Sequence, residues 1–121
     1  MATATRTIRI KRIYEKREKD DGFRVLVDRL WPRGLSKDKA QIALWFKDLA
    51  PSSELRKRYH HDAENWLEFK KAYIKELKTK EDLIKELFDK AGKRAITLLY
   101  AAKNETQNNA VVLMEYLQEK S

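Results

Sequence analysis

Apolar and polar positions alternate in the first segment of the chain that has a regular pattern, residues 6–14 (RTIRIKRIY). Ile8 and Ile10 fall on one side of this segment, whereas Arg9 and Lys11 fall on the other. A period of two with β-branched residues predicts a β-strand. Because the segment is also rich in charge, we expect it at the edge of a sheet or with one face in solvent.

A second strand is predicted over residues 23–31 (FRVLVDRLW). Apolar residues occupy both of its faces, namely Phe23, Val25 and Val27 on one and Leu26 and Leu30 on the other. The continuous apolar run of residues 95–101 (AITLLYA) predicts a third strand. Strands that are apolar on both faces are typical of central positions in a covered sheet, so we expect both segments there.

Helical spacing dominates between the second and third strands. One helix is predicted to begin at Ser36, a favourable N-cap, and to end at Pro51. Its core face carries apolar residues at i, i+3, i+4 and i+7, namely Ile42, Trp45, Phe46 and Leu49. A shorter helix, capped by Ser52 or Ser53, then reaches about Tyr59.

Three further helices are predicted from caps and apolar stripes. Asp62 caps a helix of roughly residues 63–78, whose core positions are Trp66, Phe69, Tyr73 and Leu77. The next helix ends at Gly92 and has as its core positions Leu83, Ile84, Leu87 and Phe88. Asn104 and Gln107 have the spacing of a reciprocal cap for the last helix, whose core positions are Ala110, Leu113, Met114 and Leu117.

The order of elements is strand, strand, several helices, strand and helix, which predicts an α/β fold. We expect a single small domain over residues 1–121, with a short, mostly parallel central sheet that about five helices cover. The helical crossover between residues 23–31 and 95–101 allows these two strands to be parallel. The link between the first two strands has only about eight residues, so those strands are antiparallel or are not neighbours.

The composition narrows the classes of partner and location. The 121-residue chain has 27 Lys and Arg against 19 Asp and Glu, a formal net charge of +8. Such a charge favours anionic partners, either a small phosphate-bearing molecule or nucleic acid, although solubility is an alternative because acids are interleaved with the bases. The chain has no cysteine and no long apolar run, so we expect a cytoplasmic protein without disulfides and without a membrane partner.

Polar and aromatic residues follow the two central strands. In open parallel α/β sheets, ligands bind in the crevice beyond the carboxyl ends of the strands. The residues delivered there are Asp28, Arg29, Trp31 and Arg33 after one strand and Tyr100, Lys103, Asn104 and Asn108 after the other. The N-terminus of the last helix would open onto the same crevice with free backbone N–H groups. We therefore predict that these residues form a binding site for an anion.

These residues also have plainer interpretations. Asp28 can have a structural role, in which it accepts hydrogen bonds from backbone N–H groups of the WPRG turn, residues 31–34. Trp31 can belong to the core, and Arg33 and Lys103 can be solvated. Asn104 can serve as a helix cap alone. The sequence leaves both interpretations open.

Asp28 and the only two histidines, His60 and His61, are the candidates for catalytic proton transfer. The alternative for the histidines is a capping or exposed role at the end of a helix. Adjacent residues point about 100° apart on a helix, and neither histidine has a His or Cys partner four residues away, so no metal site is predicted. The chain has no dinucleotide-binding glycine motif, no P-loop and no serine elbow, so no cofactor is predicted either.

Three segments resemble the YeaO-like branch of the Domain of Unknown Function 488 family, namely VDRLWPRG (27–34), LAPSSELR (49–56) and LLYAAK (98–103). The resemblance covers about Ile8 to Leu117 and implies a small α/β domain without an assigned activity. The polar signature that it implies lies on Asp28, Arg29, Trp31, Pro32, Arg33, Gly34, Pro51, Ser52, Glu54, Leu55, Arg56, His60, His61, Asp62, Tyr100, Ala102 and Lys103.

The chain departs from the family pattern at two positions. Relatives often have Asp and His where this chain has Asn104 and Asn109. The resemblance therefore implies either that a catalytic group has been lost here or that one residue that caps the last helix has replaced another.

Three functions are compatible with these patterns. The first is a protein with a cleft for a small anionic, nucleotide-like ligand, enzymatic or not, in which Arg29, Arg33 and Lys103 hold the anion and Trp31 or Tyr100 stacks on a ring. This hypothesis requires Asp28 and Arg33 to face one crevice. The second is a basic nucleic-acid-binding or regulatory module, and the third is a protein-interaction domain without a ligand site.

Overall fold

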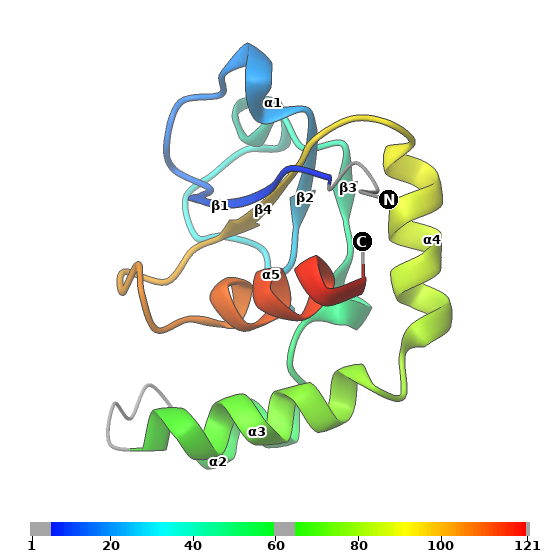
Figure 1. Ribbon diagram of the computed structural model, residues 1–121. Coiled ribbons are helices and arrows are strands. Elements are labelled where there is room, and N and C mark those ends of the chain that lie inside the picture. The colour runs from blue at the N-terminus through cyan, green and yellow to red at the C-terminus, as the bar shows by residue number, and fades with distance from the viewer. Residues whose placement is uncertain (1–5, 60–64, 121) are drawn as a thin grey trace.

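The computed structural model describes residues 6–59 and 65–120 of the chain (Figure 1). One four-stranded sheet has the order β1-β4-β2-β3. Its strands are β1 (Ile8–Arg12), β2 (Phe23–Leu26), β3 (Leu44–Trp45) and β4 (Ile96–Tyr100). Each neighbouring pair is parallel, which confirms the predicted α/β fold and makes the sheet parallel throughout.

β4 lies inside the sheet because its side chains are apolar on both faces. All five of its residues are buried, and it pairs with β1 on one side and β2 on the other. β1 and β2 are therefore not neighbours, which is one of the two arrangements that their short link allowed. β1, the strand rich in charge, lies at an edge of the sheet as expected.

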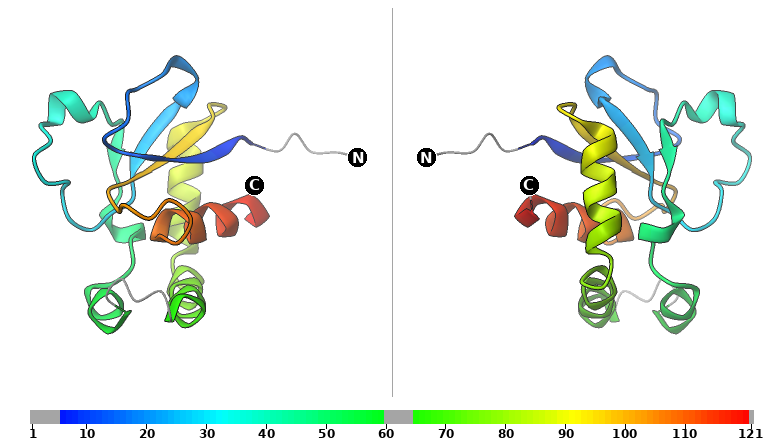
Figure 2. Two further views of the ribbon diagram at one scale, coloured as in Figure 1. Left: turned by 90° about the vertical axis from the view of Figure 1, so that its left-hand side faces the viewer. Right: turned by 90° about the vertical axis from the view of Figure 1, so that its right-hand side faces the viewer.

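The two faces of the sheet are covered unequally (Figure 2). α4 (Glu81–Ala91) and α5 (Asn109–Lys120) lie on one face, whereas α1 (Lys37–Ala40) and the loops beside it lie on the other. The larger core packs the helices against sheet residues such as Val25 and Leu98. The smaller core, on the face of α1, contains Ile13, Leu26, Ala40 and Leu99.

α2 (Ser53–Tyr59) and α3 (Trp66–Leu77) contact each other and lie beyond the end of β2 (Figures 1 and 2). The side-chain oxygen of Ser52 accepts a hydrogen bond from the backbone N–H of Leu55 at 3.1 Å, which confirms Ser52 as the cap of α2. The predicted cap of the next helix, Asp62, lies outside the described residues. The position of α2 and α3 brings their side chains close to the carboxyl end of the sheet.

The helix predicted from Ser36 to Pro51 is wrong after Ala40. α1 ends there, and Gln41 adopts a left-handed conformation with φ of +48°. The cause is Arg24, whose Nη2 and Nε donate to the carbonyl oxygens of Ala40 and Gln41, both at 2.9 Å. Arg24 therefore ends a helix that the local pattern of apolar residues would have continued.

The chain then pairs with β2 instead of remaining helical. The backbone N–H of Ala43 donates to the carbonyl of Arg24 at 2.8 Å, and that of Phe46 donates to the carbonyl of Leu26 at 2.9 Å. These bonds place β3 at the edge of the sheet, before a 3-10 helix at Lys47–Leu49. The spacing of the apolar side chains suits a helix, but the exposed edge of β2 offers hydrogen-bond partners that the sequence pattern does not show.

Two other predicted boundaries are wrong. β2 ends at Leu26 rather than at residue 31, so Asp28 and its neighbours belong to a loop. The last helix, α5, begins at Asn109 because the side chain of Asn108 caps it, accepting from the backbone N–H of Val111 at 3.1 Å. Asn104 instead accepts from the backbone N–H groups of Thr106 and Gln107, so it closes a turn before the helix.

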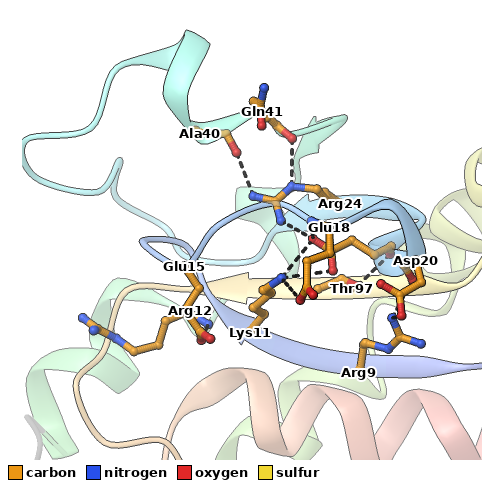
Figure 3. Close-up of polar contacts among 11 residues, drawn as sticks. Arg9, Lys11, Arg12, Glu15, Glu18, Asp20, Arg24, Ala40, Gln41 and Thr97 are labelled. Atoms are coloured by element: carbon orange, nitrogen blue, oxygen red, sulfur yellow. Dashed lines mark hydrogen bonds and ion pairs between the residues drawn. The ribbon is translucent and has the colours of Figure 1, made fainter.

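A buried ion pair holds the N-terminal end of β2 (Figure 3). Arg24 Nη1 donates to Asp21 Oδ2 at 2.6 Å, and only 3% of each side chain is exposed. Lys11 of β1 donates to the same carboxylate at 3.2 Å and to Glu18 at 3.0 Å. Thr97 of β4 donates to the backbone carbonyl of Asp21 at 2.6 Å. This network therefore ties three strands together, and the sequence patterns did not predict it.

Within the described ranges, 6–59 and 65–120, none of the helices is both long enough and apolar enough to span a lipid bilayer.

Candidate functional site

A cleft of about 480 Å³ lies beyond the carboxyl ends of β2 and β4. Its wall contains six of the residues predicted to bind a ligand or to transfer a proton, namely Asp28, Arg29, Trp31, Arg33, Asn104 and Asn108. Asp28 and Arg33 therefore face one crevice, as the hypothesis of an anion-binding site requires. The volume is within the range of about 300–1,000 Å³ that is common for small-molecule sites.

Two of the predicted site residues that the structure describes, Tyr100 and Lys103, are not found in this wall. Tyr100 is 2% exposed and belongs to the larger core, because it is the last residue of the buried strand β4. Lys103 is exposed and does not line the cleft. His60 and His61 lie outside the described residues, so the structure does not place them.

Asp28 connects the ends of two strands to the start of α5. Its Oδ2 accepts from the backbone N–H of Ala101 at 2.9 Å, and its Oδ1 accepts from Asn109 Nδ2 at 3.2 Å. The same amide nitrogen of Asn109 also donates to the carbonyl of Val27 at 2.9 Å. The carboxylate thus accepts from the end of β4 and from α5, and the predicted hydrogen bonds from the WPRG turn are wrong.

The electrostatic environment of Asp28 disfavours its charge. Burial raises the pKa of Asp28, and the hydrogen bonds from Ala101 and Asn109 and the charge of Arg56 offset only part of this effect. Among the described residues, no Lys or Arg forms an ion pair with Asp28. Asp28 is therefore a carboxylate held in place by neutral donors.

Three arginines line the cleft, and they are held differently. Arg29 is fixed, because its Nε donates to the carbonyl of Pro51 at 3.1 Å. Arg33 and Arg56 are exposed, and neither guanidinium makes a hydrogen bond or ion pair with any residue in the part of the chain that the structure describes. The backbone of Arg33 is nevertheless fixed, since its carbonyl accepts from the hydroxyl of Tyr14 at 3.0 Å. Among the described residues that line the cleft, three arginines face the single carboxylate of Asp28, which leaves this part of the wall with an excess of positive charge.

Aromatic side chains from α2 and α3 form one side of the cleft. Trp66 stacks on Phe69 with ring centroids 5.7 Å apart, and Tyr59 meets Phe69 edge to face at 6.1 Å. In the loop that follows β2, Trp31 donates from Nε1 to the carbonyl of Leu35 at 2.6 Å and packs edge to face on Trp45. Trp31 therefore packs against the smaller core, as its plainer interpretation expects, and also lines the cleft.

The predicted site did not include Arg56, Asn109 or this aromatic side of the cleft, although Arg56 belongs to the polar signature that the resemblance implies and Asn109 is one of the two departures from the family pattern. Trp66 and Phe69 were expected only as core positions of a helix. A usable signal was the pair Arg56 and Tyr59, which lie three residues apart and therefore on one face of α2. What the sequence could not show is that this face turns toward the carboxyl end of the sheet.

No metal site is supported by the described residues. The one group of carboxylates close enough to share an ion is Glu18, Asp20 and Asp21, whose oxygens lie within 4.8 Å of one another. Lys11 already lies 3.0 Å from Glu18 and 3.2 Å from Asp21, and Arg9 lies 3.7 Å from Asp20. Protein cations therefore neutralise this group, which belongs to the ion-pair network at the other end of β2.

Comparison with known proteins identifies relatives over nearly the whole chain. Residues 7–121 match the model of a family described as the inactive DUF488-N3 subclade. The uncharacterized protein YeaO of Escherichia coli (strain K12) is 46% identical over 110 residues, which cover 91% of this chain and 96% of that protein. The uncharacterized protein Rv3073c of Mycobacterium tuberculosis is 42% identical over 110 residues, which cover 91% of this chain and 92% of that protein. None of the solved structures matches the chain significantly.

Proposed function

The chain belongs to the family described as the inactive DUF488-N3 subclade, and from this premise we propose that it binds a small phosphate-bearing, nucleotide-like anion in the cleft without converting it. Membership of this family confirms the resemblance found in the motifs VDRLWPRG and LLYAAK. The observation that carries the proposal is the pair of exposed guanidinium groups of Arg33 and Arg56, which line the same cleft and have no partner among the described residues.

The arginines support an anionic ligand. A guanidinium group is planar and presents its N–H groups in a fork that matches the oxygens of a phosphate or carboxylate. Arg29 already donates to Pro51, so Arg33 and Arg56 are the two that keep this fork available. The +8 charge of the whole chain adds a long-range attraction for the same class of ligand.

The aromatic side of the cleft supports a ring in the ligand. Tyr59, Trp66 and Phe69 offer ring faces and edges beside the arginines. Stacking of a base on an aromatic side chain is worth about 1–3 kcal/mol and tolerates any base. A phosphate near the arginines and a ring near the aromatic residues together describe a nucleotide.

Binding without turnover is supported by the residue beside Asp28. Proteins of the family that the chain resembles often have His where this chain has Asn109, and Asn109 donates directly to Asp28. A side-chain amide does not ionise near neutral pH, so Asn109 gives Asp28 no titrating partner at this position. The description of the subclade as inactive agrees with this view.

Titration calorimetry at low salt tests the proposal, with AMP, GMP and inorganic phosphate as probes. We expect AMP or GMP to bind more tightly than phosphate, and Arg33→Gln combined with Arg56→Gln to weaken nucleotide binding at least about tenfold, since hydrogen bonds to charged groups contribute about 1.5–3 kcal/mol each. Arg58→Gln is the matched control, because Arg58 is exposed on the same helix but does not line the cleft.

Two results would contradict the proposal. One is the absence of binding for both nucleotides and for phosphate. The other is an equal loss of affinity in Arg58→Gln and in the double variant, which would mean that the overall positive charge, and not the cleft, attracts the anion.

A further inference from the structure

Asp28 has unused capacity to accept hydrogen bonds. An ionised carboxylate offers about four acceptor positions on its two oxygens. Within residues 6–59 and 65–120, one position on Oδ2 is filled by Ala101 at 2.9 Å and one on Oδ1 by Asn109 at 3.2 Å. Each oxygen of Asp28 can therefore accept one more hydrogen bond, and Asp28 lines the cleft.

Asn109 adds a second acceptor beside Asp28. Its Nδ2 donates to both Val27 and Asp28, and these two acceptors fix the orientation of the amide. Its Oδ1 then faces no hydrogen-bond donor within residues 6–59 and 65–120. The neighbouring Asn108 differs, because its Oδ1 accepts from Val111 and its Nδ2 donates to the carbonyl of Asn104. Asp28 and Asn109 thus form a part of the cleft wall that is rich in acceptors, which we call the acceptor floor.

The acceptor floor and the two exposed arginines carry opposite charges, and both line the cleft. A phosphate is repelled by the carboxylate of Asp28 and attracted by Arg33 and Arg56. Conversely, the floor favours a group that donates, because burying an acceptor without a donor costs free energy. A ligand that fits both has an anionic group for the arginines and an N–H donor for the floor.

On the basis of the proposed function, we infer that the cleft selects nucleotides whose base carries an amino group, and that Asp28 with Asn109 determines this selectivity. Adenine, guanine and cytosine have such an amino group, and the aromatic side chains of α2 and α3 provide stacking for the ring that bears it. Rejection of a base that lacks the donor follows because the acceptors of the floor would lose water without gaining a partner.

The test compares AMP, GMP and CMP with purine riboside 5′-monophosphate, which has the same phosphate, ribose and purine ring system as AMP but no amino group. On the native chain, we expect the tightest of the three amino-bearing nucleotides to bind at least about tenfold more tightly than purine riboside 5′-monophosphate, as for a hydrogen bond to a charged acceptor. In Asp28→Asn this ratio of affinities should fall toward one. Glu105→Gln, which removes an exposed carboxylate outside the cleft, should leave the ratio unchanged.

The outcomes separate this inference from the proposed function. If purine riboside 5′-monophosphate binds as tightly as the others and the loss of Arg33 and Arg56 weakens all four, the anion-binding function stands and the selectivity is wrong. A ratio that is unchanged in Asp28→Asn also overturns the role of Asp28. If no nucleotide binds, both proposals fail. The comparison on the native chain decides the selectivity even if Asp28→Asn does not fold.

Discussion

The two ends of β2 each carry an aspartate and arginines, but the protein uses them in opposite ways. At the N-terminal end, Asp21 and Arg24 contact each other at 2.6 Å, and only 3% of each side chain is exposed. At the C-terminal end, Asp28 accepts only from neutral donors among the described residues, while Arg33 and Arg56 are exposed on the wall of the same cleft. At the N-terminal end the charged side chains pair with one another, whereas at the C-terminal end the exposed arginines can still bind a ligand.

The pKa values of the two aspartates differ in direction for this reason. Burial alone would raise the pKa of Asp21, but the backbone N–H of Glu18 and the cations Arg24 and Lys11 together lower it below the usual value. Burial raises the pKa of Asp28, and in this case the hydrogen bonds from Ala101 and Asn109 do not compensate. Direct ion pairs thus distinguish a carboxylate that stabilises the fold from one that keeps capacity for a ligand.

The variant with the largest expected effect removes the ion pair at the N-terminal end of β2. Arg24→Met leaves Asp21 with less compensation for its burial and frees the carbonyls of Ala40 and Gln41, so we expect a loss of about 3–5 kcal/mol in the free energy of unfolding. Chemical denaturation measures it. The matched control is Arg9→Met. It removes the exposed ion pair between Arg9 and Asp20, whose charged atoms lie 3.7 Å apart, and should cost about 1 kcal/mol or less. Equal losses in the two variants would show that Arg24 has no special structural role.

The second largest expected effect comes from a comparison of two glycines with positive φ, one directly before β2 and one in the loop that follows it. A Cβ on Gly22, where φ is +68°, would lie 2.3 Å from the carbonyl oxygen of Ala95, which is held by the N–H of Phe23 at 2.8 Å. At Gly34, with φ of +76°, no described residue other than its two chain neighbours has an atom within 4 Å of such a Cβ. We expect Gly22→Ala to cost about 3 kcal/mol or more, because a clash adds to the backbone strain.

Gly34→Ala should cost only the strain, about 1–2 kcal/mol. Thermal and chemical unfolding of the two variants measure the difference. If Gly34→Ala loses as much free energy of unfolding as Gly22→Ala, the turn at Gly34 is packed as tightly as the N-terminal end of β2.

The smallest effect is the pH dependence of stability. Because its pKa is lowered in the folded state, Asp21 contributes stability above its unfolded value of about 3.8, and this is lost as pH falls through the folded pKa. Asp28 has the opposite sign. Its pKa is raised, so the folded state takes up a proton first as pH falls from neutrality, and the free energy of unfolding gains from it.

Denaturation curves between pH 7 and pH 3 for Asp21→Asn and Asp28→Asn sharpen this contrast. We expect Asp21→Asn to reduce the loss of stability in acid and Asp28→Asn to abolish a small gain on acidification. Curves of the same shape for both variants would contradict the opposite roles assigned to the two aspartates.

Much of the fold could be predicted from local patterns. The apolar runs placed β2 and β4 inside the sheet, and the caps and stripes predicted α2 and α4 where they occur. The failure at β3 has a particular cause. Ile42, Trp45 and Phe46 have helical spacing, yet Arg24 binds the last carbonyls of α1 and the edge of β2 pairs with the chain that follows. Both causes come from residues about twenty positions away, which no local pattern contains.

The place of the cleft could be predicted from the sequence, but not all of the residues that line it. The rule that ligands bind beyond the carboxyl ends of parallel strands placed Asp28, Arg33 and Asn108 in one cleft. It also placed Tyr100 there, but Tyr100 is still within the buried strand. Arg56 and Trp66 were missed because they come from α2 and α3, whose position beyond the sheet depends on tertiary packing.

The sequence by itself determined the α/β class, the central strands and the family, because alternation, apolar runs and contiguous motifs are properties of neighbouring residues. Only the tertiary structure decided which charges are paired. Asp21 and Asp28 are both aspartates beside β2, and each has an arginine within three residues, Arg24 and Arg29, so the sequence alone does not show which aspartate is paired. Asp21 meets Lys11 from β1 and Arg24, whereas Asp28 meets the amide of Asn109 from α5. The difference arises because the strength of a charge interaction depends on distance and burial, which packing between distant segments sets.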